Sequence, residues 1–90
     1  MSWTQVFIIQ DSVTNKEEYE IELNRAWLIL KHFEDKQGAT VNFKKIEITE
    51  EDLQSILVIS KEESFENECA VVALRRALSE GNCKAWHYIY

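Results

Sequence analysis

Apolar residues follow two different rhythms along this chain. Two short and dense apolar runs, residues 6–9 and 56–59, are typical of strands that are covered on both faces. Two longer stretches, residues 15–36 and 61–80, instead place apolar side chains three or four positions apart, which is typical of amphipathic helices. Residues 83–90 alternate aromatic side chains with others, and this period of two predicts a strand with two distinct faces.

The helix boundaries carry recognisable signals. A Ser or Thr followed three residues later by Glu can satisfy the free backbone N–H groups at a helix start as a capping box. Such a pair opens each helical stretch: Thr14 with Glu17, and Ser60 with Glu63. The chain has no proline and only two glycines. Each glycine follows one of the stretches, where a residue in the left-handed conformation commonly ends a helix: Gly38 and Gly81.

The stretch between the two helices is ambiguous at one point. Residues 40–48 predict a second strand, in which the alternation of apolar side chains changes phase near Lys44, as a bulge would produce. Residues 49–52 fit either a hairpin turn or the cap of a short helix that continues through Leu57. The short and mostly β-branched run at 56–59 favours the turn, followed by a third strand.

The resulting element order is βαββαβ in a single domain of 90 residues. This order matches the ferredoxin-like α+β sandwich, in which an antiparallel four-stranded sheet carries two helices on one face. Right-handed crossovers place the first and third strands in the centre of the sheet and the other two at its edges. Because this arrangement hosts many unrelated functions, it does not by itself indicate an activity.

One face of such a sheet has no helix over it. Alternation along the predicted strands assigns to this face a set of mostly aromatic and β-branched side chains: Trp3, Phe7, Ile9, Phe43, Ile56, Val58, Trp86, Tyr88 and Tyr90. An apolar patch of this size is seldom left exposed on a monomer, and aromatic residues commonly anchor interfaces. We therefore expect an interaction surface here, unless the chain's own termini cover the face or the facing of one strand is inverted.

The chain is acidic, with a net charge of −6. This charge argues against direct binding to nucleic acid, which requires clustered lysine and arginine. Most of the glutamates lie near predicted helix starts, where the helix dipole favours them. One group falls at a single end of the predicted sheet and forms a candidate acidic surface: Asp11, Glu17, Glu18, Glu47, Glu50, Glu51 and Asp52. Such a surface can mimic the phosphates of DNA, although Lys16, Lys44 and Lys45 dilute its charge.

The residues that usually carry catalysis or bind cofactors do not form recognisable sets. Two glycines are too few for a phosphate-binding loop, and neither Cys-x-x-Cys nor His-x-x-x-His occurs, so we predict no metal and no cofactor. His32 is expected on a solvated helix face. His87 is expected to point towards the helices, opposite to its aromatic neighbours.

The cysteines and the apolar runs bear on the cellular setting. Cys69 and Cys83 are expected to be free thiols, since the intervening helix would hold them too far apart for a disulfide. Neither a signal peptide nor a membrane-spanning run is evident in the sequence. A cytoplasmic setting without a membrane partner is therefore expected.

These observations favour a small, non-catalytic interaction module that binds itself or a larger protein through the aromatic sheet face. An enzyme is not excluded, because two such sheets in a dimeric α+β barrel would enclose a pocket for a small ligand or substrate near Trp86, His87 and Tyr88. A third hypothesis is an acidic inhibitor that mimics DNA and occupies a nucleic-acid-binding protein. The mass of the protein in solution would separate a homodimer from a monomer that binds another protein.

Overall fold

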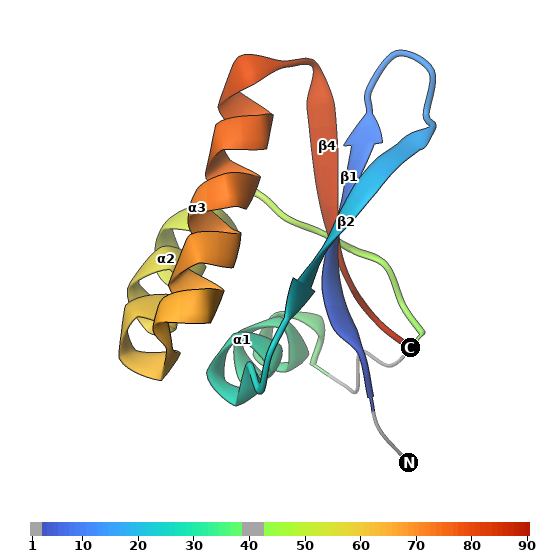
Figure 1. The fold of residues 1–90 in the computed structure, drawn as a ribbon. Helices are drawn as coiled ribbons and strands as arrows, with labels where there is room; N and C mark the ends of the chain where they lie inside the picture. The colour runs from blue at the N-terminus through green and yellow to red at the C-terminus, as the bar shows by residue number, and fades with distance from the viewer. Residues whose placement is uncertain (1–2, 39–42) are drawn as a thin grey trace.

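The computed structural model describes residues 3–38 and 43–90 and divides them between four strands and three helices (Figure 1). In chain order these elements are β1 (Gln5–Asp11), β2 (Glu17–Leu23), α1 (Trp27–Gln37), β3 (Ile46–Glu47), α2 (Glu50–Glu63), α3 (Phe65–Glu80) and β4 (Cys83–Ile89). The fold of these residues is α+β with an antiparallel four-stranded sheet, as predicted, but it has three helices rather than two.

The strands of the sheet have the order β2-β1-β4-β3, and every neighbouring pair is antiparallel. One side of β1 pairs along its whole length with β4, from Gln5 opposite Ile89 to Asp11 opposite Cys83. The other side of β1 pairs with β2 through a hairpin, and β3 adds two residues to the outer side of β4. The first and last strands are thus the central pair. The predicted ferredoxin-like order βαββαβ is not the order of this chain, which is ββαβααβ.

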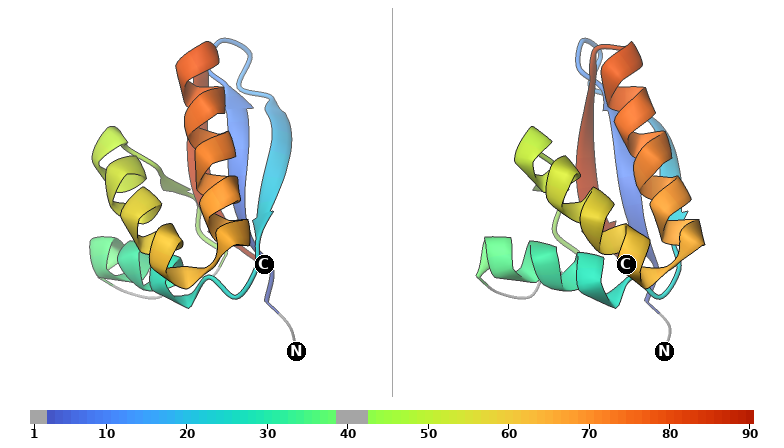
Figure 2. Two further views of the ribbon diagram at one scale, coloured as in Figure 1. Left: turned by 60° about the vertical axis from the view of Figure 1, so that its left-hand side comes forward. Right: turned by 90° about the vertical axis from the view of Figure 1, so that its left-hand side faces the viewer.

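All three helices lie on one side of the sheet (Figures 1 and 2). Helix α3 packs against β2, β1 and β4, α2 lies beside α3, and α1 runs across the lower end of the helical layer in these views. The core lies between the two layers, and its fully buried apolar side chains are Phe7, Ile9, Ile29, Phe33, Ile56, Val71 and Leu74. Among the helices of the described ranges, none has both the length and the apolar composition that crossing a bilayer requires.

The stretch predicted as the first helix is divided between strand β2 and helix α1. Tyr19, Ile21 and Leu23 are spaced two apart, which is the period of a strand, and the first and last of them are also four apart, as in a helix. Thr14 is not a helix cap. It lies in the turn of the hairpin, where its Oγ1 accepts a hydrogen bond from the N–H of Lys16 (3.3 Å).

Helix α2 takes the place of the predicted turn and third strand. Its start is a capping box, in which Thr49 Oγ1 accepts from the N–H of Asp52 (3.2 Å) and Asp52 Oδ2 accepts from the N–H of Thr49 (3.0 Å). Ser60 lies inside the helix instead of at its start, and its hydroxyl donates to the carbonyl of Leu57 (2.8 Å). Ser64 is the residue that caps α3. The helix-cap alternative is therefore the correct one, and the capping box predicted at Ser60 is wrong.

Only one of the two glycines adopts the predicted left-handed conformation. Gly38 has φ of 74°, and its N–H donates to the carbonyl of Glu34 (2.8 Å) at the end of α1. Gly81 has φ of −150°, an extended conformation that any residue can adopt. The left-handed cap predicted at Gly81 is therefore wrong.

The strand predicted over residues 40–48 is reduced to β3. Residues 40–42 lie outside the described ranges, and only Ile46 and Glu47 of the remainder belong to a strand. Phe43 has φ of 59°, and its N–H donates to the carbonyl of Ile89 (2.9 Å), so the chain already follows the outer side of β4 before β3 begins. The described part of this segment contains no bulged strand at Lys44 and Lys45.

Candidate functional site

The alternation of side chains along the central strands decides where the predicted interface residues lie. Phe7 pairs with His87 and packs beneath the helices together with Ile9, so the prediction that these two β1 residues lie on the uncovered face is wrong. The facing of β1 is inverted because a run of four apolar residues carries no alternation of its own. Ile56 and Val58 belong to α2 and not to a strand, and the first is fully buried while the second is exposed.

The open face, by which we mean the side of the sheet away from the helices, carries the aromatic residues of β4. Trp86, Tyr88 and Tyr90 alternate with the buried residues of that strand and therefore point to this face, as predicted. Val6 and Ile8 of β1 also point there, yet they are only 1% and 2% exposed. Tyr88 lies beside the first and Trp86 beside the second in the strand register, so the rings of β4 cover the middle of this face.

Polar contacts fasten these rings across the sheet. The indole N–H of Trp86 donates to Oε1 of Gln10 (2.8 Å). The rings of Tyr88 and Tyr90 stack with their centroids 5.9 Å apart, and the hydroxyl of Tyr90 donates to Oε2 of Glu20 on β2 (3.4 Å). The aromatic stripe of the open face is therefore attached to the neighbouring strands.

The part of the open face along β2 is negatively charged. Glu20 and Glu22 are both exposed there, two positions apart on the same side of the strand. The charge of Glu20 is the largest cause of a raised pKa at the phenol of Tyr90, and burial and Glu22 add to it. Carboxylates oppose ionisation of a neighbouring phenol because the product would be a second anion.

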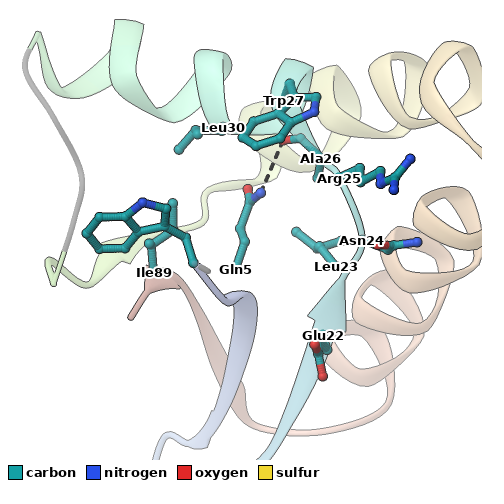
Figure 3. A pocket seen from close by; sticks show the side chains of 10 residues that line it. Gln5, Glu22, Leu23, Asn24, Arg25, Ala26, Trp27, Leu30 and Ile89 are labelled. Atoms are coloured by element: carbon teal, nitrogen blue, oxygen red, sulfur yellow. Dashed lines mark hydrogen bonds between the residues drawn. The ribbon is translucent and has the colours of Figure 1, made fainter. Parts of the chain in front are cut away.

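A groove of about 500 Å³ opens where β1 begins and β2 leads into α1 (Figure 3). Two tryptophans line it, and Trp3 is 49% and Trp27 67% exposed. Helix α1 begins at Trp27, and the indole ring of this first helical residue is exposed. Phe43 is also exposed and meets Trp3 edge to face, with 5.8 Å between the ring centroids. Three aromatic side chains therefore remain accessible in this region.

The floor of the groove is a buried polar pair. Nε2 of Gln5 donates to the carbonyl of Ala26 (3.1 Å), an interaction drawn in Figure 3, so Oε1 of Gln5 is the atom that accepts from Nε2 of His87 (2.7 Å). This arrangement leaves the proton of the neutral imidazole on Nε2, and Nδ1 has no hydrogen-bond partner among the described residues. His87 thus points towards the helices, as predicted, and stacks on Phe33 with 4.3 Å between centroids.

His87 is a neutral residue of the core. It is fully buried, and burial is the largest cause that lowers its pKa to about 4, with a smaller contribution from the charge of His32. A protonated imidazole there would lose its hydration without gaining a carboxylate partner. Its position beneath the groove is therefore structural, since no part of the ring reaches solvent.

The wall of the groove between β2 and α1 is held by residues of the helical layer. Asn67 of α3 is buried, and its side chain bonds to both backbone groups of Asn24, accepting from the N–H (3.0 Å) and donating to the carbonyl (2.8 Å). Ala26 precedes α1 without a side-chain cap, and Glu63 of α2 takes that part by accepting from the N–H of Leu28 (2.7 Å). These contacts fix the connection between β2 and α1, residues 24–26, in which Arg25 adopts φ of 50°.

Asp52 lies buried between α1 and α2 and not on an acidic surface. Its Oδ1 is 2.8 Å from Nε2 of His32, while Oδ2 accepts from Nζ of Lys36 and from the N–H and hydroxyl of Thr49 (3.0 Å each). Burial raises the pKa of Asp52, but the hydrogen bonds from Lys36, Thr49 and His32 together lower it by more, so the pKa lies well below its usual value. His32 is therefore an ion-pair partner, contrary to the solvated position predicted for it.

The other acidic candidates are not gathered at one end of the sheet. The carboxylate of Asp11 closes the hairpin turn, where the N–H groups of Thr14 and Val13 bond to it and lower its pKa. The start of α2 lies away from that turn in both views of Figure 2. The acidic residues near this start are exposed: Glu47, Glu50 and Glu51. Glu17 and Glu18 are part of β2, and their side chains lie outside what the structure describes. The predicted acidic surface is thus not assembled from the residues that are described.

Metal ligands do not cluster in the described part of the chain. No group of three or more His, Cys, Asp or Glu side chains there could hold a metal ion. Cys69 and Cys83 are not joined by a disulfide, as predicted. A comparison with protein-family models, with curated proteins and with solved structures found no match for this chain. The function must therefore be argued from the surfaces just described.

Proposed function

We propose that this protein is a small, non-catalytic module that binds a segment of a protein partner in the groove between Trp3 and Trp27. The exposure of two indole rings beside one groove is the observation that carries the proposal. Burial of apolar surface drives association, and tryptophan is among the residues that most often dominate the binding energy of an interface.

The groove is already held in shape. The bonds from Gln5 to Ala26 and from Asn67 to Asn24 fix its floor and wall, and Glu63 fixes the first turn of α1. A site that is fixed before binding loses little conformational freedom when a partner arrives. The lining of the groove is partly apolar and partly polar, and Glu22 and Arg25 supply opposite charges that can orient a partner.

The open face supports binding less well than the groove does. The rings of Trp86 and Tyr88 are half-buried and lie beside Val6 and Ile8 in the strand register, so a partner would bury less new surface on them. Large side chains on that face would also fill the space between two sheets packed together, which disfavours a dimeric barrel with a ligand pocket. The burial of Asp52 removes one central residue of the surface that a DNA mimic would need.

Selection from a library of random linear peptides tests the proposal. Peptides selected on the immobilised protein are expected to lose about tenfold or more in affinity for the Trp3→Ala and Trp27→Ala variants. Val13→Ala is the matched control, because Val13 is an exposed apolar residue in the hairpin turn and does not line the groove. Urea denaturation of each variant establishes that the fold is intact.

Two results would contradict the proposal. In the first, the selection yields no peptide that binds the wild-type protein. In the second, the selected peptides bind equally well to the wild-type protein and to both tryptophan variants.

A further inference from the structure

Strand β2 is an unpaired edge of the sheet. It is seven residues long and pairs with β1 on one side, and no strand of the described residues lies on its other side. The left-hand view of Figure 2 shows β2 at the margin of the molecule, with α3 on the face of the sheet and not across its edge. Alternate residues of β2 therefore turn backbone N–H and C=O groups towards solvent.

The opposite edge of the sheet is protected in a way that β2 is not. The short strand β3 covers β4, and backbone bonds from Phe43 and Ile48 to the carbonyls of Ile89 and Ala85 extend that cover to both sides of it. Long edges usually carry charges or bulges that prevent pairing with other chains, and the exposed glutamates of β2 oppose pairing with strands of like charge. The pairing of β2 with β1 has one register shift, which lies near the hairpin turn between Ile9 and Gln10 of β1. The rest of β2 is therefore a regular edge.

The two sides of the β2 edge differ in chemistry. Glu20 and Glu22 are exposed on the open face, whereas Tyr19 and Ile21 point to the helix side, where the tyrosine is exposed and the isoleucine half-buried. A strand added here would meet carboxylates on one face and apolar surface on the other.

A second copy of this chain does not fit the edge. Suppose that two β2 strands pair antiparallel and that the helices of both copies lie on the same side of the joined sheet. Even-numbered residues of one copy then lie opposite even-numbered residues of the other, so Glu20 and Glu22 face glutamates. Like charges directly opposite in a sheet are destabilising. The edge therefore disfavours self-association and favours a partner of opposite charge.

We infer that the edge of β2 accepts an extended basic segment of another protein as a fifth strand, with lysine or arginine side chains opposite Glu20 and Glu22. The apolar side chains of the same segment contact Tyr19 and Ile21 on the other face. Lys16 and Arg25 flank the strand, so the basic residues of the segment belong opposite its middle. This inference does not depend on occupation of the groove.

Two synthetic peptides of about nine residues provide the first test. One alternates lysine with valine, and the other alternates glutamate with valine. The wild-type protein is expected to bind the lysine peptide at least about tenfold more tightly than the glutamate peptide, and the variant Glu20→Lys with Glu22→Lys is expected to reverse this preference. The control is Glu62→Lys with Glu80→Lys, which makes the same change in net charge at exposed sites on α2 and α3. An equal loss of lysine-peptide binding in the control would overturn the inference.

Backbone methylation provides the second test. N-methylation of one alternate set of amides blocks one edge of the lysine peptide, and methylation of the other set blocks the opposite edge. Loss of binding with one set and retention with the other supports strand addition, whereas equal binding by both peptides would overturn it.

Glu22 also lines the groove whereas Glu20 does not, so two single variants distinguish the two sites. Trp27→Ala changes the groove alone, and Glu20→Lys changes the edge alone and is expected to weaken binding of the lysine peptide. Trp27→Ala is expected to leave the affinity for the lysine peptide within about twofold, because that side chain does not lie on β2. If the tryptophan variant loses the peptide while the Glu20→Lys variant retains it, the groove is the binding site and the inference about the edge is wrong.

Discussion

The two faces of the sheet bury the same strand by different means. On the helix side, Phe7 and Ile9 of β1 lie under a second layer of structure and have no exposed surface. On the open face, Val6 and Ile8 are almost as inaccessible, but their cover consists of side chains of the sheet itself. A low exposure at a residue therefore does not show that a layer lies above it.

The difference has an energetic consequence. A side chain removed from between two layers leaves a cavity that the surroundings fill only in part, and this adds to the cost of the lost apolar burial. A side chain removed from the open face is replaced by water, since Trp86 and Tyr88 are themselves half-buried and Tyr90 is exposed. Truncation of a side chain on the helix side is therefore expected to lower the free energy of unfolding more than truncation on the open face.

The largest effect is expected for Phe33→Ala. Phe33 is fully buried and stacks on His87, so its truncation is expected to cost about 3 to 5 kcal/mol of the free energy of unfolding. Trp86→Ala on the open face is expected to cost no more than about half of that, although it removes a larger ring and its bond to Gln10. Urea denaturation measures both. An equal cost for the two variants would show that the open face is as closed as the core, and a dimer detected by sedimentation would then be the explanation.

At acid pH, titration of His87 is expected to lower the free energy of unfolding by about 3 kcal/mol. Its pKa is lowered from 6.5 to about 4 in the folded protein, so the unfolded chain binds the proton more readily. The stabilisation is present in full above pH 6.5, declines as the pH falls from 6.5 to about 4, and declines no further below that. Asp52 acts in a different window, because its lowered pKa makes its contribution fall only below the ordinary aspartate range near pH 3.8.

The variant His87→Gln tests whether His87 causes the loss of stability at acid pH. Glutamine keeps a donor for Oε1 of Gln5 but does not titrate, so its unfolding free energy should change less than that of the wild type between pH 6.5 and 4. Chemical denaturation at a series of pH values gives both curves. If the two curves run parallel through this window, a group other than His87 causes the acid sensitivity.

The smallest effect is expected at Tyr90. Glu20→Gln removes the carboxylate that contributes most to the raised pKa of this phenol, so the pKa should move back towards 10. Phenolate absorbance during an alkaline titration measures the change, with Tyr90→Phe identifying the contribution of this residue. The fold should be insensitive to the substitution because both side chains are exposed. A Tyr90 titration that does not respond to Glu20→Gln would mean that the open face along β2 is not governed by its carboxylates.

The sequence predicts some elements well because their pattern admits one interpretation. The strict alternation at residues 83–90 indicates both the strand and the facing of Trp86 against His87. The chain before α1 admits two interpretations, since Tyr19 and Leu23 fit a helix as well as a strand. At residues 56–59 the β-branched run favours a strand, but packing against α1 and α3 and the capping box at Thr49 impose a helix.

The candidate site was less predictable than the fold. The exposure of Trp27 depends on where α1 begins, and the helical spacing of apolar residues over 15–36 does not indicate a start at that residue. The polar residues that shape the groove serve backbone groups far away in sequence: Gln5 bonds to Ala26, and Asn67 bonds to Asn24. Such bonds have no characteristic spacing and use residue types that are equally common on exposed surfaces. Only the structure brings them together.

The central position of β4 constrains when the protein can fold during its synthesis. The hairpin of β1 and β2 can form as soon as Leu23 has left the ribosome, because its contacts are local. The side of β1 opposite β2 stays unpaired until β4 (Cys83–Ile89) has been synthesised, and β3 also has no neighbouring strand before that point. For most of its translation the nascent chain therefore exposes the unpaired side of the apolar strand β1. Aggregation through pairing with other nascent chains is most favoured in this period.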